Sequence, residues 1–162
     1  MKKFNMIFTG ILALFIVVGV GMIIFSEKDG TSLQIDEKQK QNTPGLNTML
    51  EIQEILKNEQ LEKYLLNLEV SREDKFDQVL IELQESNFTT EDTMLKDAYN
   101  IFQSASTINQ LSQIELIWYT KVDSKNKPVL SLTLTKEAIQ QLASKSYADL
   151  PAIATKYEKY QK

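Results

Sequence analysis

The sequence contains neither cysteine nor histidine in its 162 residues. The absence of cysteine excludes disulfide scaffolds, zinc ribbons, iron–sulfur clusters and thiol nucleophiles. The absence of histidine removes the commonest general base, the commonest protein metal ligand and any serine–histidine relay. We therefore expect no catalytic residues, no metal site and no cofactor, and we predict that the protein is not an enzyme.

Glycine and positive charge are also scarce. All five glycines lie at or before Gly45, so residues 46–162 have no glycine for a phosphate-binding loop or a dinucleotide fingerprint. Lysine and arginine number 18 against 22 aspartate and glutamate residues, a net charge of -4. A nucleic-acid partner needs an excess of positive charge, so none is expected.

What the sequence does contain is one long apolar run, residues 6–25, without a single charge. As a helix rising ~1.5 Å per residue, it would span roughly 30 Å, the thickness of a bilayer core. Lys2 and Lys3 precede the run and acidic residues follow it, so the N-terminus is expected in the cytoplasm. We assign residues 1–25 as a signal-anchor, that is, a transmembrane helix, and predict a single-pass protein of the cell membrane. The alternative is a cleaved signal peptide and a secreted protein, although signal-peptide cores are shorter.

The polar segment 26–45 predicts a flexible linker, because it has almost no apolar residues and no periodicity. Residues 46–162 carry the periodic patterns and are expected to form an extracytoplasmic α+β domain. The composition, rich in lysine, asparagine and glutamine and free of cysteine, is typical of the bacterial cell envelope with one membrane and a wall.

Period-two alternation of apolar residues predicts four strands, around 66–70, 79–83, 114–119 and 130–134. The charged segments 71–77 and 123–127 are expected to be the turns of two hairpins. Pro128 is expected at the start of the fourth strand, since it lacks an amide donor. Arg72, the only arginine, falls in the first turn, where we expect no anion clamp.

Helices are predicted before, between and after the hairpins. Thr48 starts the first through a capping box, Thr89 and Thr90 precede the second, and Thr135 caps the third. The last starts at Asp149 and is expected to run through Tyr160. The predicted order is α-ββ-α-ββ-α-α, a four-stranded antiparallel sheet packed by helices on one face.

The same alternation divides the strands into two faces. The residues expected to point inward are Leu66, Leu68, Val70, Val79, Ile81, Leu83, Leu116, Trp118, Leu130, Leu132 and Leu134. On the outward face, apolar side chains among glutamates predict a contact surface. Its candidate interaction residues are Glu69, Leu80, Glu82, Glu115, Ile117, Tyr119 and Thr133. The alternative is that the glutamates only keep the face solvated and protect it from aggregation.

Together these features predict a non-enzymatic, membrane-anchored protein that binds another envelope protein, as a component or regulator of a membrane complex. The alternative is a cell-wall or glycan-binding module in which Tyr119 stacks on sugar, with wall polymer as the partner. A wall-polymer hydrolase is the least favoured alternative. Glycosidases hold two acids at a fixed separation with one in a buried setting, and outward glutamates on a sheet have no cleft.

Overall fold

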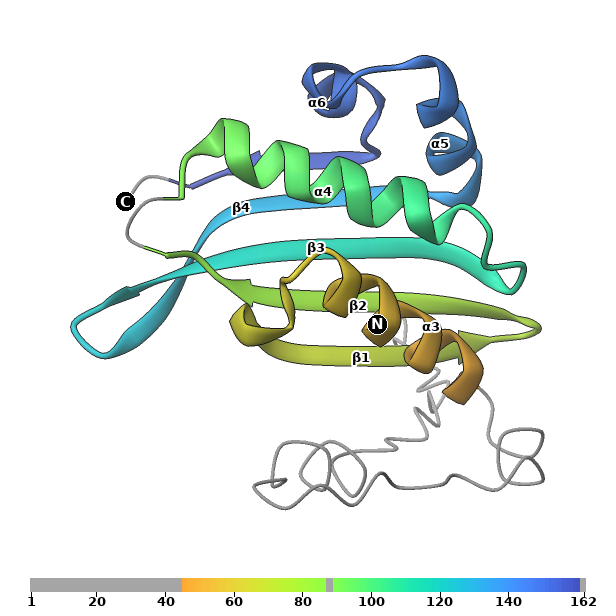
Figure 1. The fold of residues 1–162 in the computed structure, drawn as a ribbon, viewed down its shortest axis with the longest axis horizontal. Helices are drawn as coiled ribbons and strands as arrows, with labels where there is room; N and C mark the ends of the chain where they lie inside the picture. Colours follow the sequence, from red (N-terminus) through yellow and green to blue (C-terminus); the bar gives the residue numbers. More distant parts are fainter. Residues whose placement is uncertain (1–44, 87–88, 161–162) are drawn as a thin grey trace, which may run out of the picture. The chain divides into compact units, whose positions relative to one another are not determined.

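The computed structural model describes residues 45–86 and 89–160, which form an α+β domain (Figure 1). In chain order the elements are α3 (Leu46–Asn58), η1 (Glu62–Tyr64), β1 (Leu65–Glu73), β2 (Phe76–Gln84), α4 (Glu91–Ala105), β3 (Leu111–Val122), β4 (Lys125–Thr135), α5 (Lys136–Gln141), η2 (Leu142–Ser144), η3 (Tyr147–Asp149), α6 (Leu150–Ile153) and β5 (Lys156–Lys159). The predicted membrane helix and all of the predicted linker except Gly45 lie outside the described residues. Within those residues, no helix combines the length and apolar character that a membrane crossing requires.

The sheet is mixed and has five strands in the order β1-β2-β3-β4-β5. The two predicted hairpins are present, as antiparallel pairs β1/β2 and β3/β4. However, β2 and β3 are parallel, so the prediction of a wholly antiparallel sheet of four strands is wrong. The reason is the path of α4, which carries the chain from the end of β2 back to the start of β3.

The fifth strand replaces the long C-terminal helix that the sequence predicted. Only α6 is helical there, with Pro151 in its first turn, and the chain then pairs with β4 as the antiparallel strand β5. Thr155 fixes this arrangement, because its amide and its hydroxyl both donate to the Thr133 carbonyl, at 2.9 and 2.8 Å. The observed order is therefore α-ββ-α-ββ-α-α-β.

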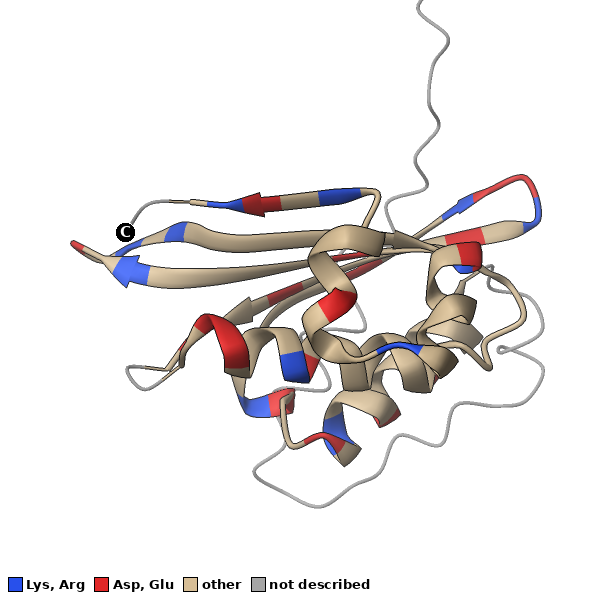
Figure 2. Cartoon of the chain, turned by 90° about the horizontal axis from the view of Figure 1, so that it is seen from above, with Lys and Arg blue, Asp and Glu red and all other residues tan. Residues whose placement is uncertain are grey.

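The helices all lie on one side of the sheet, as predicted (Figure 2). The core forms between them, where Ala98, Ile101 and Phe102 of α4 have no exposed surface. The inward strand residues join this core with one exception. Leu66 is 43% exposed, because a bulge between Leu65 and Asn67 shifts the register of β1.

The predicted threonine caps are confirmed in two cases and corrected in one, and the last helix starts after Asp149 as predicted. Thr90 and Thr135 cap α4 and α5, each accepting a hydrogen bond from the amide three residues later. Thr48 does not cap α3. That helix follows Gly45, whose φ of 80° is the left-handed conformation that favours glycine, and Thr48 is buried in the first turn.

The hairpin turns are tighter than predicted. Residues 74–75 alone connect β1 to β2, and residues 123–124 alone connect β3 to β4, so the strands continue through most of the charged segments. Pro128 lies inside β4 rather than at its start. It is placed at a bulge opposite the Trp118–Tyr119 step, a position where a missing amide donor is tolerated.

Candidate functional site

The side of the sheet turned away from the helices, here called the open face, carries all seven candidate interaction residues. The cross-strand register arranges them in rows. The first row runs across all five strands and contains Glu69, Leu80, Glu115, Thr133 and Lys156. Directly opposed side chains in such rows have Cβ atoms about 4.5–5.5 Å apart, so neighbours in the row are in reach of one another. Thr133 is only 7% exposed, so this candidate residue is buried.

The second row lies beside the first and contains Asn67, Glu82, Ile117, Ser131 and Glu158. Tyr119 follows at the next position of β3, opposite Gln84 of β2. Lys156 and Glu158 were not among the candidates, because their segment was expected to be helical. Within the segment 156–159 only Tyr157 is not charged, so its sequence holds no alternation that distinguishes a strand from a helix end.

Hydrogen bonds hold one half of the open face in a fixed arrangement. The Tyr119 hydroxyl donates to Glu82 Oε1 at 2.6 Å, and Asn67 Nδ2 donates to Glu82 Oε2 at 3.0 Å and to Glu69 Oε1 at 2.9 Å. The hydrogen bond to the Glu82 carboxylate, together with burial, raises the pKa of Tyr119 to about 12. The phenol is therefore protonated at neutral pH and donates this hydrogen bond. The hydrogen bonds hold the carboxylates of Glu69 and Glu82 in place before a partner binds.

The other half of the open face is ordered around Lys156. Its ammonium lies 3.2 Å from Glu158 Oε2 and 3.8 Å from Glu115 Oε1. The hydrogen bond to Glu158 raises the pKa of Lys156, while hydrogen bonds from Tyr160 and then Lys156 lower the pKa of Glu158. Across the two rows, four carboxylates face one ammonium, and Leu80 and Ile117 lie half-buried among them. The surface is acidic with an apolar centre.

A polar cluster that the sequence reasoning missed lies on the other side of the sheet. Asp77 of β2 is completely buried, and the Arg72 guanidinium binds its carboxylate through Nε at 2.6 Å and Nη2 at 2.9 Å. Thr48 donates its hydroxyl to Asp77 Oδ2 at 2.5 Å. The same guanidinium also donates to Gln110 Oε1 at 2.7 Å. The cluster therefore ties α3, the first hairpin and the loop before β3 together.

Arg72 lies within β1 rather than in the first turn, and its guanidinium is paired with a carboxylate of the same chain. The hydrogen bond to Asp77 raises the pKa of the guanidinium further. Strand alternation held a usable signal, because Arg72 shares the inward parity of Leu68 and Val70, and Asp77 that of Val79. Two opposite charges at inward positions of one hairpin predict a buried ion pair. The role of this pair is to hold parts of the fold together.

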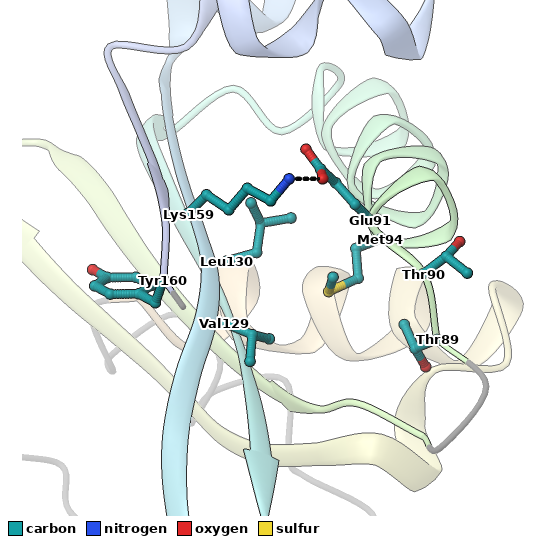
Figure 3. Close-up of a pocket in the computed structure, with 8 residues that line it drawn as sticks. All are labelled: Thr89, Thr90, Glu91, Met94, Val129, Leu130, Lys159 and Tyr160. Carbon is teal, nitrogen blue, oxygen red and sulfur yellow. Dashed lines mark hydrogen bonds and ion pairs between the residues drawn. The ribbon is translucent and has the colours of Figure 1, made fainter. Parts of the chain in front are cut away.

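A pocket of about 640 Å³ lies between the start of α4 and the strands β4 and β5 (Figure 3). Its floor is apolar, with Met94, Val129 and Leu130, and Lys159 reaches across it to form an ion pair with Glu91. Hydrogen bonds from Lys159 and then from Tyr157 lower the pKa of Glu91. These contacts join β5 to α4. They also pair Lys159 with Glu91, the two charged groups that a ligand in this pocket would otherwise contact.

A second pocket, of about 130 Å³, lies beside η1, β2 and α4 and is lined in part by Asp97. Burial, and then the charge of Glu59, raise the pKa of Asp97. Glu69, Glu82 and Glu115 line neither of these two pockets.

The described ranges 45–86 and 89–160 also contain no group of three or more acidic side chains placed to hold a metal ion. The arrangement of the open face suits binding of a partner, since its charged groups are ordered and its apolar residues are grouped. Comparison with protein-family models, with curated proteins and with solved structures found no match to this chain.

Proposed function

We propose that this protein is a non-enzymatic binding protein of the bacterial cell envelope. In this proposal, residues 6–25 anchor the chain in the membrane, and the extracytoplasmic domain binds another envelope protein as part of a membrane complex or as its regulator. The observation that carries the proposal is the open face, where six candidate residues from β1, β2 and β3 form a surface that no described helix covers (Figure 2), while the seventh, Thr133, is buried.

Preorganisation supports a binding role. Glu82 already accepts hydrogen bonds from Tyr119 and Asn67, so a partner does not have to pay the entropy of ordering that carboxylate. Leu80 and Ile117 are adjacent to glutamates in the rows, an apolar centre with a polar surround, as in protein interfaces. The excess of carboxylates favours a partner with lysine or arginine around an apolar patch, because complementary charge speeds and orients association.

The test uses the full-length chain crosslinked and purified from native membranes. The variant Glu69→Lys/Glu115→Lys reverses two charges in the first row and leaves the Glu82–Tyr119 hydrogen bond in place. The control Glu51→Lys/Glu54→Lys makes the same change in net charge on exposed positions of α3. A protein partner that is retained by the control and lost from the open-face variant supports the proposal. Equal retention by both variants contradicts it.

The alternative, a wall- or glycan-binding module, has one supporting observation. Tyr119 and Tyr160 each bind a glutamate of the open face through the hydroxyl, and Tyr160 keeps 37% of its surface exposed. Aromatic rings held in this way suit stacking on a sugar ring. Co-sedimentation with purified wall polymer, abolished by Tyr160→Ala and retained by Glu69→Lys/Glu115→Lys, would favour this alternative over a protein partner.

A further inference from the structure

The two edge strands of the sheet, β1 and β5, differ in length and in lysine content. At one edge, β5 has four residues and carries Lys156 and Lys159, and short lysine-bearing edge strands resist pairing with another chain. At the other edge, β1 has nine residues, contains neither lysine nor proline, and exposes most of its side chains. In the described part of the chain, the only strand beside β1 is β2.

We propose that β1 pairs antiparallel with β1 of a second copy of this chain, which joins two five-stranded sheets into one sheet of ten. An unpaired edge strand presents a row of backbone donors and acceptors, and an identical strand satisfies them across a two-fold axis. The pairing uses the backbone edge of β1, and Glu69 is the one open-face candidate that lies on this strand, so the pairing does not require the proposed partner.

The register of the pairing follows from the bulge in β1. The bulge lies between Leu65 and Asn67, and the regular part of the strand runs from Asn67 to Glu73, with Val70 at its midpoint. An antiparallel copy therefore pairs the whole regular run only when Val70 lies on the two-fold axis. Opposed residues then share a face of the sheet, so both open faces lie on the same side.

The side chains are compatible with this register. Glu69 lies opposite Ser71 of the second copy, Leu68 opposite Arg72, and Asn67 opposite Glu73, so like charges do not oppose each other. Moving the axis to Glu69 would place two glutamates directly across from each other, which destabilises a cross-strand pair. The charge pattern thus favours the same axis as the length of the regular run.

Gly45 lies next to the proposed two-fold axis. A Cβ atom on Gly45 would lie 2.9 Å from Val70 Cγ1, so the N-terminal end of the described chain meets β1 at the proposed axis. In the pair, both Gly45 residues are close together and on the same side of the joined sheet. This geometry is compatible with two chains whose predicted anchors lie in one membrane, and the shared membrane raises their effective concentration.

Helix α3 brings apolar surface to the same region. It lies over β1 and β2 (Figure 1), and its Leu46, Met49 and Leu50 are half-exposed and do not belong to the hydrophobic core. The two-fold axis keeps both α3 helices on the same side of the joined sheet.

Cysteine crosslinking tests the register, because the natural chain has no cysteine. Full-length chains carrying Glu69→Cys and Ser71→Cys, with different tags, are co-expressed and oxidised in membranes. Directly opposed positions have Cβ atoms close enough for a disulfide, whereas the diagonal distance between two copies of one position is about 7–8 Å. We expect the mixed pair to crosslink and each single variant to crosslink far less. The matched control places Lys156→Cys and Glu158→Cys on the other edge strand.

Crosslinking of the mixed pair no greater than that of the control overturns the proposal. So does stronger crosslinking of Glu69→Cys to itself, because that requires another register.

A second measurement changes the charge at position 71, where the side chain is exposed, so that the fold is retained. Sedimentation of the full-length chain in detergent gives the dissociation constant of the dimer.

Ser71→Glu places two glutamate pairs across the interface and should raise the dissociation constant about 2- to 30-fold. Ser71→Lys places lysine opposite Glu69 and should lower the constant by a similar factor. Equal constants for the two variants, or a chain that is monomeric at all concentrations, contradict the pairing. A monomer would mean that β1 binds another partner or another segment of its own chain.

Discussion

The buried ion pair between Arg72 and Asp77 gives the sharpest prediction about stability. The substitution Arg72→Met keeps an unbranched apolar stem but removes the guanidinium. Asp77, whose side chain is 0% exposed, then loses the hydrogen bonds at 2.6 and 2.9 Å, and from the described residues its carboxylate keeps only the one from Thr48. A buried carboxylate without its counter-charge is costly because water cannot replace the lost partner.

Removing one member of a buried ion pair costs about 3–5 kcal/mol of unfolding free energy. We expect the lower end, about 3 kcal/mol, because Arg72 is 27% exposed and Thr48 still donates to Asp77. Asp77→Asn should cost less, about 1–2 kcal/mol, since the remaining guanidinium reaches water. The double variant should cost less than the sum of the two, because the unpaired buried charge is absent.

The assay is urea unfolding of the full-length chain in detergent, followed by the fluorescence of Trp118. This is the only tryptophan, and it is 2% exposed in the core, so its signal reports loss of the sheet. A cost below about 1 kcal/mol for Arg72→Met would contradict the expected penalty for leaving the buried Asp77 carboxylate unpaired. A larger cost for Asp77→Asn than for Arg72→Met would refute it as well.

Three further predictions use the same assay. Gly45→Ala should cost about 1–2 kcal/mol, because φ is 80° and the new Cβ would crowd Val70 at 2.9 Å, while Asn47→Ala nearby should be near neutral. Phe102→Ala should cost about 3–5 kcal/mol, since the ring is fully buried, and a cost below that of a surface substitution would contradict its place in the core. Burial raises the pKa of Asp97 above 3.8, so the fold disfavours the charged form and loses stability as the pH rises through the raised value. Asp97→Asn should therefore melt at a higher temperature than the natural chain at pH 7 but not at pH 3; a lower melting temperature at pH 7 would show that the carboxylate has a stabilising partner.

Local patterns predicted the elements that depend on short-range physics. Alternation at period two located the strand pairs of both hairpins and the outward residues of the open face, because side chains alternate across any strand. Thr90 and Thr135 were recognisable as caps, since a hydroxyl before a helix bonds an amide three residues later in any fold. Thr48 fits the same pattern and was assigned wrongly, because the buried carboxylate of Asp77 competes for its hydroxyl.

Long-range pairing decided the rest. Whether β3 lies beside β2, and in which direction, depends on how α4 packs across the sheet, and no local pattern records that. Residues 156–159 form a strand because the edge of β4 offers them backbone partners, whereas in isolation they suit a helix end equally well.

The sequence by itself thus determined the composition of each face, the positions of most caps and the chemistries that missing cysteine, histidine and glycine exclude. The tertiary structure alone decided which of those faces meet. It placed Glu69, Glu82 and Glu115 on one ordered surface with Lys156. It also paired the Arg72 guanidinium with the Asp77 carboxylate. The physical reason is that alternation and capping act over a few residues, whereas contacts between strands depend on the burial and backbone pairing of the whole domain.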